Sequence, residues 1–298
     1  HALGTREVHV VLPGDRPRAA AAVEHAVAER ADGIEWQTRV AEPRFVAGQA
    51  RAVLELLAGR PNLPVTAWKP EAFSGHQDRP TLLSNGETFA HVGLLGLRGP
   101  AAYQGLGTTT EPGTTLLTIS EPSMGVRVEE VPYGTRWRDV LTGDLAGRDA
   151  LIGGFHGSWA RAETLRAARV SVGQMRALGI PLGAGVVYLP ARGQCPLDLT
   201  AAIVNYLADQ SARRCGPCFN GLPALAQALR GVRDGTASQE EVRRLAQLVR
   251  GRGACAHPDG TARLVSSCLA TFADEVSAHV SRRCPARAAA AVGGVRPA

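Results

Sequence analysis

The sequence predicts a fold of class α/β followed by α: a partial α/β layer, a small β-grasp domain and a C-terminal four-helix bundle. Three observations lead to this prediction. Strand-like runs of β-branched residues alternate with alanine- and leucine-rich helical segments near the start of the chain. Two adjacent strand-like runs, a short helical segment and another strand-like run follow in the middle. Beyond residue 199, apolar residues recur three to four positions apart, which is the spacing of one helix face.

The N-terminal elements follow one another in strand–helix order. Residues 8–12 are rich in valine and predict a strand, and the alanine-rich residues 18–30 predict a helix. Residues 34–40 predict a second strand, and residues 46–58 predict a second helix that is stopped by the Gly-Arg-Pro sequence at 59–61. Two strands and two helices form an incomplete layer unless another element covers the sheet.

A change of composition separates this layer from the middle of the chain. Residues 62–115 are rich in Pro, Gly, Thr and Ser and predict a long connection over the surface. Connections of this length usually carry function or depend on a partner. Strands are then predicted over residues 115–119 and 126–131, a helix over 135–141 and a strand over 150–154. This β-β-α-β order fits a small β-grasp domain.

The last hundred residues are predicted to be mainly helical. A strand over residues 185–189 precedes them. Ser238 and Glu241 have the spacing of a capping box and open the third of four helices. Four helices joined by short links predict a bundle. The predicted helices cover residues 199–211, 222–232, 238–251 and 264–280, and the predicted domains cover residues 1–113, 114–178 and 179–285, followed by a disordered tail over 286–298.

Positive charge in this chain is carried almost entirely by arginine. Lys and Arg together number 33 against 27 Asp and Glu, a formal net charge of +6, and Lys69 is the one lysine. This asymmetry reflects codon usage as much as a design for polyanions, and we predict no nucleic-acid partner. No run reaches the ~18 apolar residues of a membrane span, and no signal-peptide pattern opens the chain. We therefore expect a cytoplasmic protein.

Cysteine is confined to the last third of the chain. This one-ended clustering around a C-x-x-C sequence favours metal or redox chemistry over a secreted disulfide framework. Cys268 lies on the apolar face of the last predicted helix and is expected to pack in the core. Two others, outside the C-x-x-C region, are expected to be bystanders. The six cysteines are Cys195, Cys215, Cys218, Cys255, Cys268 and Cys284, and the expected bystanders are Cys195 and Cys284.

The Cys215-Gly216-Pro217-Cys218 sequence is the most informative local feature. A thioredoxin-like redox pair follows a buried strand, whereas residues 205–214 are polar and helix-like, which disfavours that interpretation. Two thiolates on one tight loop and Cys255 on another can instead converge on a metal ion or cluster. Such centres normally take four ligands, so the fourth could come from His257, from Asp259 or from a distant cysteine.

Several segments match one family in the same order. Residues 210–221 read Q-S-A-R-R-C-G-P-C-F-N-G and resemble the cluster loop E-S-C-G-x-C-x-P-C-R-E-G. Residues 80–88 resemble P-T-x-x-N-N-V-E-T, residues 44–59 resemble the helix opened by G-E-E, and residues 115–154 resemble an SLBB-like β-grasp module. The family so resembled is the FMN-carrying, NADH-oxidising subunit of bacterial respiratory complex I, with relatives in NAD-linked hydrogenases and formate dehydrogenases.

The resemblance implies an electron-transfer subunit of the NADH-quinone oxidoreductase type, which passes electrons from NADH via FMN to an iron–sulfur cluster and a partner. The implied cluster is [4Fe–4S], or [3Fe–4S] where a ligand is missing. The implied partners are NADH and ferredoxin-like or complex I-like subunits, which would place the chain at the inner face of a membrane at most peripherally. Implied FMN-binding residues are Gly48, Gln49, Ser84 and Asn85, and implied cluster ligands are Cys215, Cys218, Cys255 and His257.

The departures from the family pattern limit this expectation. Ala212 stands where the family has its first cluster cysteine, and Gln49 stands where it has an acid. The glycine-rich flavin and nicotinamide segments are expected upstream of His1, so the chain is not expected to be active alone, and no catalytic residue is singled out. The alternatives are a non-catalytic docking or relay protein with a degenerate or zinc-occupied cluster site, and a zinc-stabilised binding module.

Overall fold

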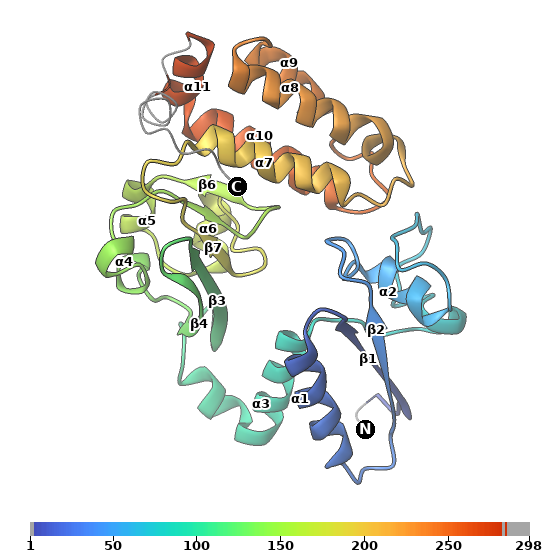
Figure 1. Ribbon diagram of the computed structural model, residues 1–298. Coiled ribbons are helices and arrows are strands. Elements are labelled where there is room, and N and C mark those ends of the chain that lie inside the picture. Colours follow the sequence, from blue (N-terminus) through green and yellow to red (C-terminus); the bar gives the residue numbers. More distant parts are fainter. Residues whose placement is uncertain (1–2, 282–283, 285–298) are drawn as a thin grey trace. The chain divides into compact units, whose positions relative to one another are not determined.

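The computed structural model describes residues 3–281 and residue 284 and has the predicted mixed α/β character (Figure 1). Within the described residues the chain divides into two compact units. The first unit contains the residues up to 83 together with 210–215, and the second contains residues 84–209 together with those from 216 onward. The predicted disordered tail over 286–298 lies outside the described residues.

The first unit contains a parallel pair of strands, β1 (Glu7–Pro13) and β2 (Glu35–Ala41), connected by helix α1 (Pro17–Ala28). These elements confirm the predicted strand–helix–strand order. The next helix, α2 (Ala50–Leu57), begins four residues later than predicted. Gln49, directly before it, has an extended backbone with ψ 137°, so the buried residues at 46 and 47 belong to a turn rather than to the helix. A short 3-10 turn, His76–Asp78, follows.

The predicted surface connection over residues 62–115 is wrong in one respect, because it contains helix α3 (Gly86–Gln104) (Figure 1). Asn85 caps this helix by accepting a 2.8 Å hydrogen bond from the backbone N–H of Thr88. The helix is kinked at Gly99, whose φ is +77°, just before Pro100. No residue of α3 is buried, and glycines and Pro100 interrupt its apolar residues, so the composition predicted a connection rather than a helix.

The second unit contains a mixed sheet. Within residues 84–281 its strand order is β4-β3-β7-β5-β6, in which β7 is parallel to β3 and the other neighbours are antiparallel. Strand β7 lies beyond the domain boundary predicted at residue 178 but pairs with both β3 and β5, so the sheet extends past that boundary. The strands are β3 (Thr114–Glu121), β4 (Gly125–Pro132), β5 (Ala150–Ile152), β6 (Ser158–Ala160) and β7 (Val186–Tyr188).

Short helices cover the sheet and close its core. Trp137 is fully buried and donates a 3.2 Å hydrogen bond from its indole N–H to the sulfur of Met175. Both side chains pack with Leu117 and Val187 of the sheet in one apolar cluster. A buried indole with a satisfied N–H contributes apolar contact without leaving a polar group unpaired. The helices are α4 (Trp137–Val140), α5 (Ala162–Ala167) and α6 (Val172–Ala177), with a 3-10 turn at Gly143–Leu145.

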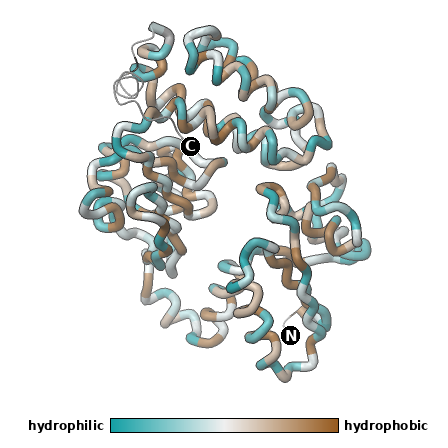
Figure 2. The backbone as a smooth tube through the Cα atoms, viewed as in Figure 1, coloured by the Kyte–Doolittle hydropathy of each residue, from teal (hydrophilic) through white to brown (hydrophobic). Residues whose placement is uncertain are grey.

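Four longer helices pack on one another in a ring: α7 contacts α8 and α10, and α9 contacts α8 and α10. In Figure 2 hydrophobic and hydrophilic residues alternate along α7, as expected for a helix that buries one side. Ser238 caps α9 as predicted, but Glu241 pairs with Arg244 instead of completing a capping box. The helices are α7 (Pro196–Asp209), α8 (Leu222–Asp234), α9 (Gln239–Val249) and α10 (His257–Thr271).

The predicted fourth helix over 264–280 is in fact two helices, α10 and α11 (Ala273–Val280). Phe272 separates them with a non-helical backbone of φ −117° and ψ 42°. Its buried ring makes an edge-to-face contact with Trp159, with the ring centroids 5.1 Å apart. The apolar spacing continues through the break, so it could not reveal it. Among the described helices, none is long and apolar enough to span a bilayer.

The β3–β4 turn depends on one carboxylate. Glu121 accepts hydrogen bonds from the Ser123 hydroxyl, from the backbone N–H groups of Ser123 (2.7 Å) and Met124 (3.0 Å), and from Arg148 (3.2 Å). These donors, the Ser123 hydroxyl first, lower the pKa of Glu121 from 4.5 to about 2 despite the opposing effect of burial.

We expect Glu121 to stabilise the fold in a pH-dependent way. The folded state binds the proton more weakly than the unfolded state, so this stabilisation is present above pH 4.5 and is lost as the pH falls towards 2. Urea unfolding of wild type and Glu121→Gln between pH 7 and pH 3 should show a smaller pH dependence in the variant. Glu163→Gln, at an exposed position, is the control, and equal acid dependence in all three proteins would contradict the assignment.

Candidate functional site

The first two predicted cluster cysteines lie where α7 ends and the next helix begins. Cys215 is half-buried in a loop, and Cys218 is 1% exposed in a π-helical turn, Pro217–Gly221, that leads directly into α8. A π-helical turn is rare and occurs mostly at functional positions. Arg213, shortly before it, has a left-handed backbone with φ +54°. The unusual backbone on both sides of Cys215 marks this segment as specialised.

Cys255 is half-buried in the loop between α9 and α10. Asp259 closes this loop by accepting a 2.6 Å hydrogen bond from the backbone N–H of Gly251. The loop is tight at Gly253, where an added Cβ would lie 2.7 Å from the carbonyl oxygen of Cys255. Asp259, one of the suggested fourth ligands, therefore already has a structural role in shaping the Cys255 loop.

Packing between the π-helical turn and α9 connects the surroundings of Cys218 and Cys255. The turn contacts α9 directly, and an added Cβ at Gly221 would lie 2.4 Å from the Val249 side chain. Val249 is the last residue of α9, and the Cys255 loop follows it. Gly221 thus permits a close approach of the two segments that a larger residue would prevent.

His257 is placed differently from its predicted role as a fourth ligand. It is fully buried, its Nε2 lies 2.8 Å from the carbonyl oxygen of Leu207, and its Nδ1 lies 2.9 Å from Nε2 of His156. The carbonyl can only accept, so Nε2 of His257 carries the proton and Nδ1 accepts from His156. Both nitrogens of His257 have hydrogen-bond partners in this arrangement, so binding to iron would require one of these contacts to break.

The two histidines form a neutral pair. Burial, and then the neighbouring His257, lower the pKa of His156 to about 3, and burial lowers the pKa of His257.

Ala212, at the position of the family's first cluster cysteine, is half-buried in the loop before Cys215. Its methyl group offers no ligand atom.

The residues implied in flavin binding lie at two helix starts. Gly48 is exposed, with no atom within 4 Å of an added Cβ, and Gln49 is the N-cap residue of α2 but makes no side-chain capping bond. Ser84 is exposed, whereas the side-chain oxygen of Asn85 caps α3. Open space at the start of α2 is compatible with a close ligand approach, while Asn85 has a structural partner already.

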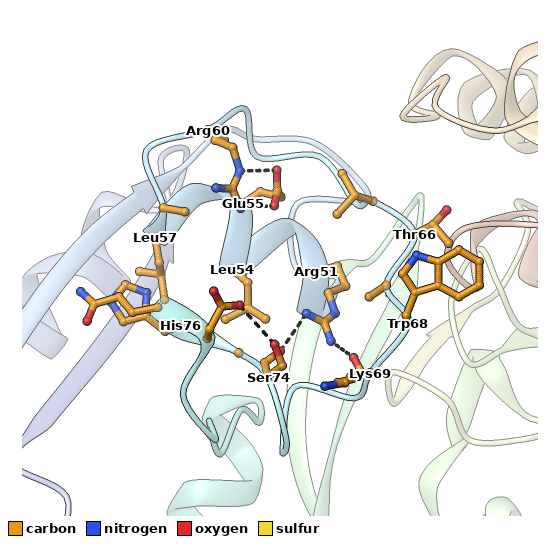
Figure 3. A pocket seen from close by; sticks show the side chains of 16 residues that line it. Arg51, Leu54, Glu55, Leu57, Arg60, Thr66, Trp68, Lys69, Ser74 and His76 are labelled. Carbon is orange, nitrogen blue, oxygen red and sulfur yellow. Dashed lines mark hydrogen bonds and ion pairs between the residues drawn. The ribbon is translucent and has the colours of Figure 1, made fainter.

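A pocket of about 660 Å³ lies in the first unit, between α2 and the loop that follows it (Figure 3). Arg51 extends from α2 and donates hydrogen bonds to the backbone carbonyl oxygens of Ser74 (3.1 Å) and Lys69. Trp68 is 96% exposed at the pocket rim. No sequence pattern predicted this pocket, although the one lysine of the chain, next to a tryptophan in a proline-rich segment, was an available signal.

Glu55 and Arg60 also belong to the charged lining of the pocket. Arg60 donates two hydrogen bonds to the Glu55 carboxylate, at 2.8 Å and 2.5 Å. The Arg60 side chain is the main cause that lowers the pKa of Glu55. The Glu55 carboxylate is thereby neutralised by a fixed partner. Asp78 also lines the pocket and accepts a 3.3 Å hydrogen bond from the Ser74 hydroxyl, so Arg51 and Lys69 exceed the remaining acid by one positive charge.

Comparisons with known proteins agree with the cysteine pattern. Residues 198–279 match the NADH-ubiquinone oxidoreductase-F iron-sulfur binding region. The chain is 27% identical to the F 2 subunit of NADH-quinone oxidoreductase from Rhizobium meliloti over 96% of this chain and 73% of that protein. It is 25% identical to the HndC subunit of the NADP-reducing hydrogenase from Solidesulfovibrio fructosivorans over 83% of this chain and 53% of that protein.

The fold has a solved counterpart. It is a crystal structure of an NAD+-reducing [NiFe]-hydrogenase in the H2-reduced state, with a TM-score of 0.82 and 22% identity. The match covers 99% of this chain and 55% of the hydrogenase chain. The chain therefore spans about half the length of that hydrogenase chain and of HndC. The similarity to HndC and to the Rhizobium meliloti subunit extends beyond residues 198–279 over most of the chain.

Proposed function

We propose that this chain is an electron-transfer subunit of an NADH:acceptor oxidoreductase, in which electrons pass from NADH via FMN to an iron–sulfur cluster and then to a partner. The main support is the match of residues 198–279 to the iron-sulfur binding region, because the matched residues include Cys215, Cys218 and Cys255. The relatives found by sequence are named as components of NADH-quinone oxidoreductase and of NADP-reducing hydrogenase.

The donor set fits a cluster. Cys215 and Cys255 lie in short loops and Cys218 lies in the π-helical turn before α8, and thiolates are the usual ligands of iron–sulfur clusters. Cys215 and Cys218 are separated by only two residues, so one tight loop can present both. The engaged nitrogens of His257 and the methyl group of Ala212 favour a cluster of three irons, or one whose fourth iron has a non-cysteine ligand. Such a group supplies one-electron transfer when bound.

The pocket beside α2 fits the anionic and aromatic parts of a nucleotide. Arg51 and Lys69 offer positive charge to phosphates, and Trp68 offers an exposed ring on which a flat base can stack. We place part of the NADH or FMN site there, with Gly48 allowing a close backbone approach at the start of α2. Gln49, Ser84 and Asn85 remain proposed contacts.

The exposed arginines Arg213 and Arg214, next to Cys215, support a docking role. A positive surface at a cluster loop steers the approach of an acidic partner. We propose a ferredoxin-like or complex I-like electron-transfer subunit as that partner. Association with a membrane would then be peripheral and indirect.

At the level of domains, we propose that the sheet with its short helices is an SLBB-like β-grasp module and that α7–α10 form the four-helix cluster domain. The antiparallel β3–β4 pair followed by α4 and β5 supports the first assignment. The ring of contacts among α7, α8, α9 and α10 supports the second. The domain limits 1–113, 114–178 and 179–285 stay proposals, and the second module would also have to include β7, which lies beyond residue 178.

A second candidate is a docking or relay protein whose degenerate cluster site holds zinc. The observation that favours it is the loss of a complete ligand set, since neither Ala212 nor the hydrogen-bonded His257 supplies a fourth ligand. Zinc accepts thiolate ligands without redox chemistry. Metal analysis separates the two candidates.

We expect protein purified without oxygen to contain about three to four irons and a similar amount of sulfide per chain. Cys218→Ser should lose most of this iron, because the buried thiol at the start of α8 is removed. Cys268→Ala, which removes a fully buried thiol from α10 outside the predicted ligand set, is the control and should retain it.

Ala212→Cys should raise iron occupancy and convert an oxidised-state EPR signal of a three-iron cluster into a reduced-state signal of a four-iron cluster. The electron-transfer proposal would be wrong if the wild type contained zinc and no iron and Cys218→Ser lost that zinc. The docking or relay protein would then be the supported function. An unchanged metal content in Ala212→Cys would show that this residue does not face the cluster.

The pocket makes a separate prediction. Lys69→Ala should weaken binding of NADH or FMN, measured by fluorescence titration, by about tenfold, because one charge-assisted phosphate contact is lost. Arg18→Ala, which removes an exposed cation from α1 outside the pocket, is the control. Equal affinities of both variants and the wild type would exclude Lys69 from the nucleotide site.

A further inference from the structure

Two cysteines expected to be bystanders, Cys195 and Cys284, lie together with His279 in a buried cluster. Their exposed fractions are 5%, 6% and 2%. The two sulfur atoms and a ring nitrogen of His279 all lie within 4.8 Å of one another, and Cys195 Sγ is 2.9 Å from His279 Nε2. Cys195 directly precedes α7, and His279 is in the last turn of α11.

The orientation of His279 is that of a metal ligand. Its Nδ1 lies 2.7 Å from the carbonyl oxygen of Arg233, near the end of α8. A carbonyl can only accept, so Nδ1 carries the proton and Nε2 presents its lone pair to the Cys195 sulfur. A hydrogen bond from the distal nitrogen to a backbone carbonyl is the usual support of a metal-bound imidazole.

We propose that Cys195, His279 and Cys284 bind a zinc ion that is distinct from the predicted cluster. Tetrahedral zinc, with bonds of about 2.3 Å to sulfur and about 2.0 Å to nitrogen, separates sulfur from nitrogen by roughly 3.5 Å and the two sulfurs by roughly 3.8 Å. Both values exceed the 2.9 Å between Cys195 Sγ and His279 Nε2 and are smaller than the 4.8 Å within which all three ligand atoms lie. Small side-chain adjustments therefore suffice.

The chemistry of the cluster favours zinc among common metals. Two sulfurs and one imidazole form a mixed donor set that zinc accepts, whereas magnesium and calcium prefer oxygen ligands. On binding, each thiol releases its proton to solvent and becomes a thiolate, and His279 binds in its neutral form. The fourth position is taken by water or by Asp198, which lies in the first turn of α7 and pairs with Arg233 at 3.8 Å.

The ion would join segments that are distant in sequence. Cys195 fixes the start of α7, His279 fixes the end of α11, and the Arg233 carbonyl connects the same site to α8. Helix α11 has only eight residues and is separated from α10 by the break at Phe272. Because α11 does not continue α10, a zinc ion bound by His279 would stabilise α11 against the rest of the second unit.

The test is zinc content of the full chain, measured by mass spectrometry of the metal after exchange into zinc-free buffer. We expect the Cys215→Ser, Cys218→Ser double variant to retain about one zinc per chain, because the predicted cluster ligands are not involved. Cys195→Ser and His279→Gln in this background should each fall below about 0.2 zinc per chain. Cys268→Ala in the same background is the matched control, since it removes a neighbouring buried thiol and should keep the metal.

A second measurement leaves Cys195, His279 and Cys284 unchanged and therefore does not depend on the folding of Cys195→Ser or His279→Gln. The double variant reconstituted with Co²⁺ should show thiolate-to-cobalt charge transfer and the strong visible bands of tetrahedral cobalt, and added Zn²⁺ should abolish them. Retention of zinc in both Cys195→Ser and His279→Gln would overturn the proposal. So would a disulfide between Cys195 and Cys284 in freshly alkylated protein, or failure of the double variant to bind either metal.

Discussion

The second unit depends on Trp159, which joins its sheet to its helices. The indole N–H donates a 2.9 Å hydrogen bond to the Thr200 hydroxyl on α7, and the backbone N–H lies 3.1 Å from the Ser267 hydroxyl on α10. Its ring packs against Phe272 at the end of α10. Strand β6, only three residues long, thereby gains partners in two helices.

Arginine supports this junction. Arg161 follows β6 directly, bonds to Asp149 and Glu275 at 3.1 Å and 3.4 Å, and lies with its guanidinium 4.7 Å from the Phe272 ring centroid. A planar guanidinium can satisfy two carboxylates and stack on an aromatic ring at once, which an ammonium group cannot do. The arginine bias of the composition thus has a structural use here, whatever its origin in codon usage.

Local patterns predicted much of this fold, and tertiary contacts account for what they missed. The alternation of strand and helix, the β3–β4 pair and the Ser238 cap depend on near neighbours and were predicted. Helix α3 is interrupted by glycines and Pro100 and has no buried face, so its composition predicted a surface connection. The break at Phe272 is fixed by Trp159, more than a hundred residues away in sequence, and the apolar spacing runs through it unchanged.

The candidate sites divide in the same way. The C-x-x-C loop identified Cys215 and Cys218 because spacing alone brings two thiols together. His257 looked like a ligand from its distance to Cys255, but its ring is engaged by His156 and Leu207, which only the fold could show. Cys195, His279 and Cys284 lie together because the last turn of α11 contacts the residue that precedes α7. The His-x-x-x-x-Cys spacing of the last two was the available signal, and it is weak.

The non-helical backbone at Phe272 also bears on how the protein opens. Helix α10 is buried along much of its length, so exposing its amide protons requires loss of most of the second unit's core. Helix α11 lies beyond the break, so in the absence of the proposed zinc ion we expect it to separate from α8 while α10 stays folded. Solvent exchange of amide hydrogens should therefore distinguish two cooperative regions within what the sequence presents as a single helix, and the more labile region is the one that carries His279.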